Sequence, residues 1–269
     1  MYKLVALDMD GTLLTSNKTI SPRTKQAIQA AREQGVVVVL ASGRPVDGMV
    51  RYLDELGMTS DQDYVLSYNA SLVQRIASKE VIRKQILTGL DAKNIANLAR
   101  ELGCHVHAFS TEHGLITPAD NYYTQHEAKI NQISTTVMDF SELADDDEII
   151  KVMLIDEPEV LSAAIAQLPA ELYEQYTIVQ SAPFFLEIMN PKSNKGTGVA
   201  MLAEHLGLEA SQVICMGDAG NDSHMLEYAG LGVAMGNATD DVKALANHIT
   251  ASNDEDGVAL VIEEFILNK

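Results

Sequence analysis

Residues 4–12, LVALDMDGT, are the part of this sequence that most clearly indicates a fold class. Its apolar first half predicts a short buried strand, and the acidic residues and glycine that follow predict a loop. Asp8 and Asp10 are two residues apart in extended backbone, so their side chains are expected to project to the same side. A buried parallel strand that ends in two carboxylates predicts an α/β protein with a functional site at the strand end.

Helix and strand patterns alternate after this stretch and again in the last third of the chain. Ser21 suits a helix N-cap, Gly35 suits the end of that helix, and the β-branched run that follows suits a strand. The alternation predicts a parallel sheet with right-handed crossovers. The predicted elements are a helix between Ser21 and Gly35, a strand over 36–40, a helix between Pro45 and Gly57, a strand over 64–66, a helix over 195–206, a strand over 213–216, a helix over 222–228 and a strand over 231–234.

The middle of the chain has a different texture, in which strands such as 149–155 mix with helices such as 91–102. This pattern is typical of an α+β unit. We therefore expect two domains: a core made of residues 1–82 and 189–269, and an inserted domain made of residues 83–188.

The composition is that of an acidic globular protein. Of the 269 residues, 19 are Lys or Arg and 38 are Asp or Glu, which gives a formal charge of −19, and 46% are apolar. The excess of acid opposes binding to nucleic acid or to an anionic membrane. The first residues show no signal-peptide pattern, and Cys104 and Cys215 read as reduced core thiols. We therefore expect a cytoplasmic protein, either a monomer or a homodimer.

Polar side chains follow several of the predicted strands at the point where each strand ends. They are Asp8, Asp10, Ser42, Asp218, Asn221 and Asp222, and Lys195 begins the helix that precedes the last of these strands. Ligands of open α/β sheets bind beyond the carboxyl ends of the strands, so these side chains are expected to outline one pocket. Clustered carboxylates need a cation or raised pKa values, and oxygen ligands without His or Cys favour Mg²⁺. Mg²⁺ and Lys195 would then admit a phosphate group.

The two aspartates at the first strand end suit phosphoryl transfer. Asp8 would attack phosphorus in line and carry the phosphoryl group as an aspartyl phosphate. Asp10, kept protonated by its anionic neighbours, would protonate the leaving oxygen and then deprotonate the water that hydrolyses the intermediate. The predicted reaction is the hydrolysis of a small phosphate monoester.

Four motifs together resemble those of the haloacid-dehalogenase (HAD) superfamily of phosphatases. They are Asp8-Met9-Asp10-Gly11-Thr12, Ser42-Gly43-Arg44-Pro45, Asn194-Lys195-Gly196 and Gly217-Asp218-x-x-Asn221-Asp222, and they occur in this order. The insertion between the second and third motifs resembles the type IIB cap of the Cof-type branch. The resemblance implies a Rossmann-like core, an inserted cap that selects the substrate, and a small phosphorylated metabolite, most simply a sugar phosphate, as that substrate.

The resemblance also implies a role for each motif residue. Asp8 would be the nucleophile and a Mg²⁺ ligand, and Asp10 would be the acid/base and offer its backbone carbonyl to the metal. Asp218 would be the third protein ligand, and Asp222 would lie behind the ligands or reach the metal through water. The phosphoryl group would be held by Met9 through its backbone, Ser42, Gly43, Lys195 and Asn221.

Several residues near these motifs keep two interpretations. Arg44 would touch the substrate or brace the cap, and Ala70 stands where family members commonly carry Gly, near the expected cap hinge. A group of ring-bearing residues would line a cap pocket or serve only in packing. These are His105, His107, Tyr122, Tyr123 and His126.

Other functions compete with a sugar phosphatase. A phosphomutase would pass the group from the same aspartyl phosphate to another hydroxyl, and a phosphorylated cofactor such as pyridoxal phosphate or flavin mononucleotide could be the substrate. A phospho-accepting signalling module would hold phosphate without turnover, but it would have a shorter chain and no insertion. A dinucleotide-binding oxidoreductase is disfavoured because the first strand leads into Asp8 and Asp10 instead of a glycine fingerprint.

Overall fold

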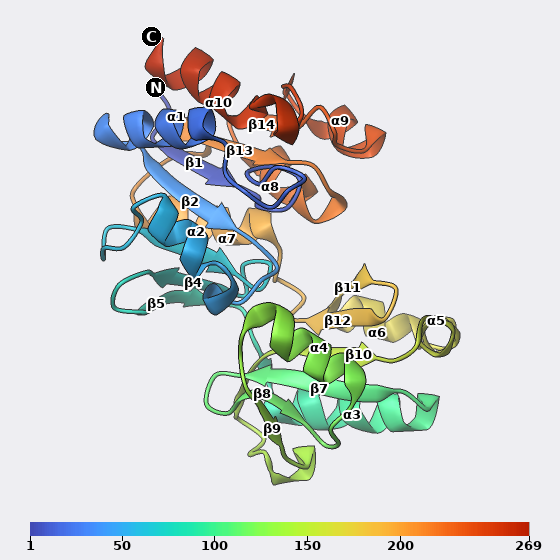
Figure 1. Ribbon diagram of the computed structural model, residues 1–269. Helices are drawn as coiled ribbons and strands as arrows, with labels where there is room; N and C mark the ends of the chain where they lie inside the picture. Colours follow the sequence, from blue (N-terminus) through green and yellow to red (C-terminus); the bar gives the residue numbers. More distant parts are fainter. Residues whose placement is uncertain (269) are drawn as a thin grey trace. The chain divides into compact units, whose positions relative to one another are not determined.

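The computed structural model describes residues 1–268, and the chain divides into two compact units (Figure 1). The first unit combines Met1–Lys84 with the chain from Asn194 onward, and the second unit is Gln85–Ser193. The first unit is thus discontinuous in sequence, with the second inserted into it. Within residues 1–268, no helix combines the length and apolar character needed to cross a membrane.

The first unit is built on a sheet of eight strands in the order β15-β14-β13-β1-β2-β3-β4-β5. The first six strands of this order pair in parallel, and β4 and β5 continue the sheet in antiparallel fashion. The strands are β1 (Leu4–Leu7), β2 (Val37–Ala41), β3 (Tyr64–Ser67), β4 (Leu72–Arg75), β5 (Val81–Lys84), β13 (Val213–Gly217), β14 (Leu231–Ala234) and β15 (His248–Ile249). The predicted parallel α/β sheet is confirmed, and the two antiparallel strands were not predicted.

Helices cover both faces of this sheet (Figure 1). Alternate residues of β1 face opposite sides, so that Val5 and Leu7 join a core with α1, α2 and α10, whereas Leu4 and Ala6 join a core with α7, α8 and α9. The helices are α1 (Pro22–Glu33), α2 (Val50–Glu55), α7 (Lys195–His205), α8 (Ser223–Tyr228), α9 (Asp240–Leu245) and α10 (Gly257–Ile262). Short helical turns are η1 (Val46–Gly48), η3 (Ala210–Gln212), η4 (Gly220–Asp222), η5 (Asn253–Glu255) and η6 (Glu263–Leu267).

Local sequence explains where these helices begin. Ser21 caps α1 by accepting a hydrogen bond from the Thr24 backbone N–H, and Pro22 occupies the first turn, as predicted. The predicted helix after Pro45 is divided, because η1 turns tightly before α2 begins at Val50. Cys215 lies buried in β13 as a free thiol, and Cys104 is a buried free thiol of the second unit, in agreement with the sequence.

The second unit has a largely antiparallel sheet in the order β11-β12-β10-β7-β8-β9, with β6 also paired to β10. The strands are β6 (Leu87–Thr88), β7 (His105–Ser110), β8 (Gly114–Thr117), β9 (Thr135–Val137), β10 (Glu148–Ile155), β11 (Thr177–Ala182) and β12 (Phe185–Met189). The helical segments are α3 (Gly89–Leu102), α4 (Tyr122–Asn131), η2 (Phe140–Glu142), α5 (Pro158–Ile165) and α6 (Ala170–Gln175). Residues of α3 and α5 form an apolar core on one face of this sheet, whereas α4 contacts polar side chains of the other face.

Candidate active site

The candidate site lies where the strand order of the first unit reverses. From β1 the chain proceeds to β2 and β3 on one side, whereas β13 lies on the other side of β1, and all of these pairings are parallel. Asp8 directly follows β1, Ser42 directly follows β2, and Asp218 directly follows β13. Such a reversal point is where open α/β sheets leave a crevice for ligands.

Lys195 connects two of the predicted acidic residues. It is the first residue of α7, whose N-cap Asn194 accepts a hydrogen bond from the Thr197 backbone N–H. The Lys195 ammonium is fully buried and donates to the Asp8 carboxylate and, at 2.7 Å, to Oδ1 of Asp222. A buried ammonium needs anionic or polar partners for its three N–H groups, and Asp8 and Asp222 are such partners for Lys195.

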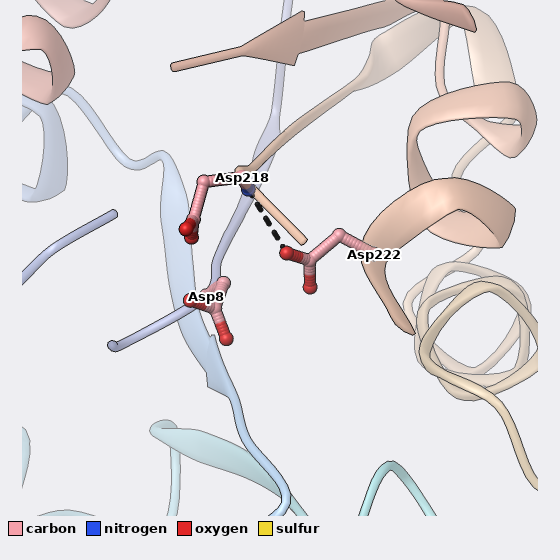
Figure 2. Close-up of side chains that lie close together, drawn as sticks. All are labelled: Asp8, Asp218 and Asp222. Carbon is pink, nitrogen blue, oxygen red and sulfur yellow. Dashed lines mark hydrogen bonds between the residues drawn. The ribbon is translucent and has the colours of Figure 1, made fainter. Parts of the chain in front are cut away.

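Asp218 and Asp222 complete an acidic cluster with Asp8 (Figure 2). The Thr12 hydroxyl donates to Oδ1 of Asp218 at 2.9 Å. The second carboxylate oxygen of Asp222 accepts from the backbone N–H groups of Asp218 and Ala219, both at 3.0 Å. Gly11 has φ of +90°, and a side-chain carbon there would overlap the Asp218 carboxylate. The close approach of the Gly11 backbone to Asp218 therefore requires glycine.

The cluster carries more negative than positive charge. One oxygen from each of Asp8, Asp218 and Asp222 lies within 4.8 Å of the others, and the Lys195 ammonium contacts Asp8 and Asp222. Burial raises the pKa of Asp8 well above its usual range, and although Lys195 opposes this shift, Asp222 reinforces it. Burial also raises the pKa of Asp218. Burial would lower the pKa of Lys195, but Asp8 and Asp222 outweigh burial and raise it. A further cation would relieve this imbalance.

Asp10 does not join this cluster, and the expectation that anionic neighbours keep it protonated is wrong in this structure. The Lys18 ammonium donates to its Oδ1 at 2.7 Å, and Arg44 donates through both Nε and Nη2 at 2.7–3.0 Å. Burial alone would raise the pKa of Asp10, but the hydrogen bonds from Lys18 and Arg44 outweigh it and lower the pKa below the usual value. Asp10 is therefore a carboxylate that is held by two cations.

The remaining motif residues surround the same strand ends. Met9 is fully buried, and the Ser42 hydroxyl accepts from the Arg44 backbone N–H at 3.2 Å, next to Gly43. The Asn221 amide donates to Oδ1 of Asn69 at 3.1 Å. Sequence reasoning missed Lys18 and Asn69, because neither belongs to a motif and both reach the site only through the folding of their loops.

The ring-bearing residues of the second unit divide into separate groups. His107 is fully buried: its Nδ1 lies 3.1 Å from the Thr124 hydroxyl, and burial lowers its pKa to about 3. His105 lines a pocket of about 160 Å³ together with Arg100 and Cys104. The other three rings, Tyr122, Tyr123 and His126, form a partly exposed aromatic cluster with Phe184.

Known proteins resemble this chain over its whole length. The family model for haloacid dehalogenase-like hydrolases matches residues 5–262. YxeH of Bacillus subtilis is 43% identical over 271 residues, which cover 100% of both chains. YitU of the same organism, a 5-amino-6-(5-phospho-D-ribitylamino)uracil phosphatase by name, is 30% identical over 272 residues, which cover 97% of both chains.

A solved structure agrees with these sequence relatives. The HAD subclass IIB sugar phosphatase BT4131 superposes with a TM-score of 0.78 at 26% identity, over 98% of both chains. The family match covers both units of the chain and includes all four motifs. The chain therefore belongs to the haloacid dehalogenase-like hydrolase family and is a phosphatase of its Cof-type branch.

Proposed function

We propose that the protein hydrolyses small phosphate monoesters in a Mg²⁺-dependent reaction that passes through an aspartyl phosphate on Asp8. The observation that carries the proposal is the convergence of Asp8, Asp218 and Asp222 around the buried Lys195, at the carboxyl ends of the adjacent strands β1 and β13. These side chains come from segments up to about 200 residues apart, yet they meet at the reversal point of the sheet.

The acidic cluster fits a hard divalent cation. Its donors are carboxylate oxygens, and the three carboxylates exceed the single positive charge that Lys195 supplies to Asp8 and Asp222. Asp8, Asp218 and the backbone carbonyl of Asp10 would hold Mg²⁺, and Asp222 would remain behind them on Lys195. When bound, Mg²⁺ would offset the negative charge that a phosphate group brings to Asp8.

Asp8 and Asp10 would share the chemistry in two steps. A carboxylate oxygen of Asp8 forms a bond to phosphorus as the bond from phosphorus to the ester oxygen breaks, and the Asp10 carboxyl gives its proton to that oxygen. Water then attacks phosphorus and gives a proton to Asp10. The bond from phosphorus to the Asp8 oxygen breaks, so that phosphate is released and the Asp8 carboxylate is restored.

The ion pairs of Asp10 add one requirement to this scheme. Asp10 can donate a proton only after its contacts with Lys18 and Arg44 loosen. A phosphate dianion would compete with Asp10 for the same two cations, and their withdrawal would raise the pKa of Asp10 toward that of a general acid. Substrate binding would in this way prepare the acid.

The phosphoryl oxygens would be held by groups around the strand ends. Lys195 supplies positive charge, the Ser42 hydroxyl and the Asn221 amide can donate, and the backbone at Met9 and Gly43 lies in the same loops. Donors fixed before the reaction stabilise the charge of the transition state at little reorganisation cost.

We propose that residues 1–82 and 189–269 form the catalytic core and that the inserted domain, residues 83–188, selects the alcohol half of the substrate. A sugar phosphate is the first candidate, because BT4131 is named a sugar phosphatase. A phosphorylated ring compound is the second, because YitU is named an aminouracil phosphatase and the second unit offers stacked rings, with Tyr123 and Phe184 5.2 Å apart between centroids.

A panel of phosphate monoesters assayed with Mg²⁺ tests the proposal, with the Asp8→Asn protein as the blank. We expect release of inorganic phosphate from sugar phosphates, and isomerised product in place of free phosphate would indicate a phosphomutase. A preference for pyridoxal phosphate or flavin mononucleotide that Tyr123→Ala removes would favour a ring substrate. No phosphate release from any monoester would contradict the proposed function.

A further inference from the structure

Three consecutive residues between β3 and β4 have left-handed backbone conformations. Tyr68, Asn69 and Ala70 have φ values of 53°, 54° and 67°. Residues other than glycine visit this region singly, at a cost of roughly 1–3 kcal/mol each, and they persist there only where the surroundings enforce it. A whole turn of this kind therefore requires strong contacts on both of its sides.

The backbone of this left-handed turn, residues 68–70, is tied to the loop after β2. The Asn69 N–H donates to the Ser42 carbonyl at 2.9 Å, and the Tyr68 N–H donates to the Arg44 carbonyl at 3.1 Å. Two hydrogen bonds thus fix the left-handed turn to the segment that supplies Ser42 and Gly43.

The Asn69 side chain reaches a different segment. Its Oδ1 accepts the hydrogen bond from Nδ2 of Asn221 at 3.1 Å, and the Asn69 residue is only 7% exposed. Asparagine adopts the left-handed region more readily than other residues with a side chain, so this position combines a demanding backbone with an amide acceptor.

The last residue of the left-handed turn packs on a third segment. Ala70 is 2% exposed, and its Cβ lies so close to Gly198 of α7 that a side-chain carbon at Gly198 would overlap it. Helix α7 begins with Lys195. The left-handed turn therefore contacts all three segments that carry the proposed phosphate-binding side chains Ser42, Asn221 and Lys195.

We propose that Asn69 is a positioning residue that fixes the Asn221 amide for the phosphoryl group. This inference rests on the proposed function. With Oδ1 of Asn69 accepting one N–H of Asn221, the amide plane of Asn221 is oriented before phosphate arrives, and its other N–H can donate to a phosphoryl oxygen. Without Asn69, the Asn221 side chain would rotate freely and would lose entropy on binding each phosphate.

Asn69→Gly tests this role, because glycine keeps the left-handed backbone and removes only the amide. We expect kcat/KM for p-nitrophenyl phosphate with Mg²⁺ to fall about 3- to 10-fold, the range of one hydrogen bond, and the Kd for inorganic phosphate to rise by the same factor. The melting temperature should not fall. Ala70→Gly is the matched control, since it relaxes the same turn without touching the amide, and it should stay within twofold of the wild type.

A double-mutant cycle separates positioning from a local packing effect. Asn69→Gly should add less than twofold to the loss caused by Asn221→Ala, because Asn69 acts through Asn221. Independent, multiplicative losses would overturn the inference, as would wild-type values of kcat/KM and phosphate Kd in Asn69→Gly. Phosphate Kd values, measured calorimetrically with Mg²⁺, decide the matter even if the wild type hydrolyses no monoester, an outcome that contradicts only the proposed function.

Discussion

Lys195 in the first unit and Lys151 in the second unit are both buried among carboxylates, and the two clusters differ in what surrounds them. The Lys195 cluster consists of Lys195, Asp8, Asp218 and Asp222, at the carboxyl ends of parallel strands. The Lys151 cluster consists of Lys151, Glu127 and Glu187, with the Lys151 ammonium 3.2 Å from Glu187 and 3.9 Å from Glu127.

The Lys151 cluster lies within secondary structure. Lys151 and Glu187 belong to the middle of β10 and β12, and α4 brings Glu127 against them. Burial raises the pKa of Glu127, and Lys151 only partly opposes this shift. The Lys195 cluster, by contrast, lies at the ends of elements, since Asp8 and Asp218 directly follow β1 and β13 and Lys195 begins α7. Its third carboxylate, Asp218, is not hydrogen-bonded to the lysine. A buried lysine between carboxylates is therefore no sign of catalysis by itself, and position at strand ends with an excess of acid is the informative feature.

Neutralising one carboxylate in each cluster is the strongest test of the difference between the two clusters. Asp8→Asn should lower kcat for p-nitrophenyl phosphate by about 10⁴-fold or more, because it removes the proposed nucleophile. Glu187→Gln, its counterpart beside Lys151, should leave kcat within a few-fold. Circular dichroism verifies that both variants are folded. Retention of more than a few per cent of activity by Asp8→Asn would remove Asp8 from that role.

Metal removal should act through the Lys195 cluster, which has the excess of acid. Dialysis against EDTA should reduce activity about 10²-fold or more, and Mg²⁺ should restore it, because the excess negative charge of the Lys195 cluster repels phosphate without a cation. Mg²⁺ should also raise the melting temperature of the wild type but not of Asp218→Asn. Full activity in metal-free buffer would reject the magnesium site.

Replacement of each lysine by methionine separates function from stability. Lys195→Met should lower kcat/KM about 10²-fold or more, through the loss of the positive charge that is proposed to bind phosphate. Lys151→Met should reduce the free energy of unfolding by about 3–5 kcal/mol, since it strands two buried carboxylates, and should leave kcat of the folded enzyme nearly unchanged. Denaturant titration and steady-state kinetics on both variants measure the contrast. An equal loss of kcat in the two would show that the clusters do not differ in function.

The smallest expected effect concerns pH and the second unit. His107 has a pKa of about 3 when folded, against an ordinary value of 6.5. Above pH 6.5 both states are neutral, so its contribution to stability is fully present there. Between pH 6.5 and about 3 the unfolded state binds the extra proton, and the free energy of unfolding should fall by up to about 1.4 kcal/mol per pH unit.

A histidine variant isolates this contribution. His107→Leu should flatten the fall in stability between pH 6 and pH 4, measured by urea titration. His113→Gln, in the turn after β7, is the matched control and should retain the slope of the wild type. The same slope in both variants would remove His107 as the cause.

The sequence predicted those parts of the fold that depend on residues close together along the chain. The apolar run before Asp8, the Ser21 cap and the strand at β2 each act within a few residues, and all three occur as expected. The placement of Asp8 and Asp218 together also follows from such patterns, because parallel strand ends meet at one edge of a sheet.

The sequence did not predict contacts that depend on the conformation of loops or on strands far apart along the chain. The charge of Asp10 depends on Lys18 and Arg44, whose reach is set by loop conformation and not by any local pattern. The left-handed turn at Asn69 contains no glycine, and although asparagine tolerates positive φ, no local pattern predicted three such residues in a row. The strand order of the second sheet likewise depends on the pairing of β10 with β7 and β12, which are distant from it in sequence.

The ribosome synthesises β1 before β13, and this order matters because the two strands pair. Leu4 and Val213 are register partners, so β1 acquires its neighbour β13 only after the whole inserted unit has been made. A nascent chain carries Asp8 long before Asp218, Asp222 and Lys195 exist. Under the proposed mechanism, hydrolysis therefore requires the chain that follows the inserted unit, and fragments that stop within that unit lack Asp218, Asp222 and Lys195.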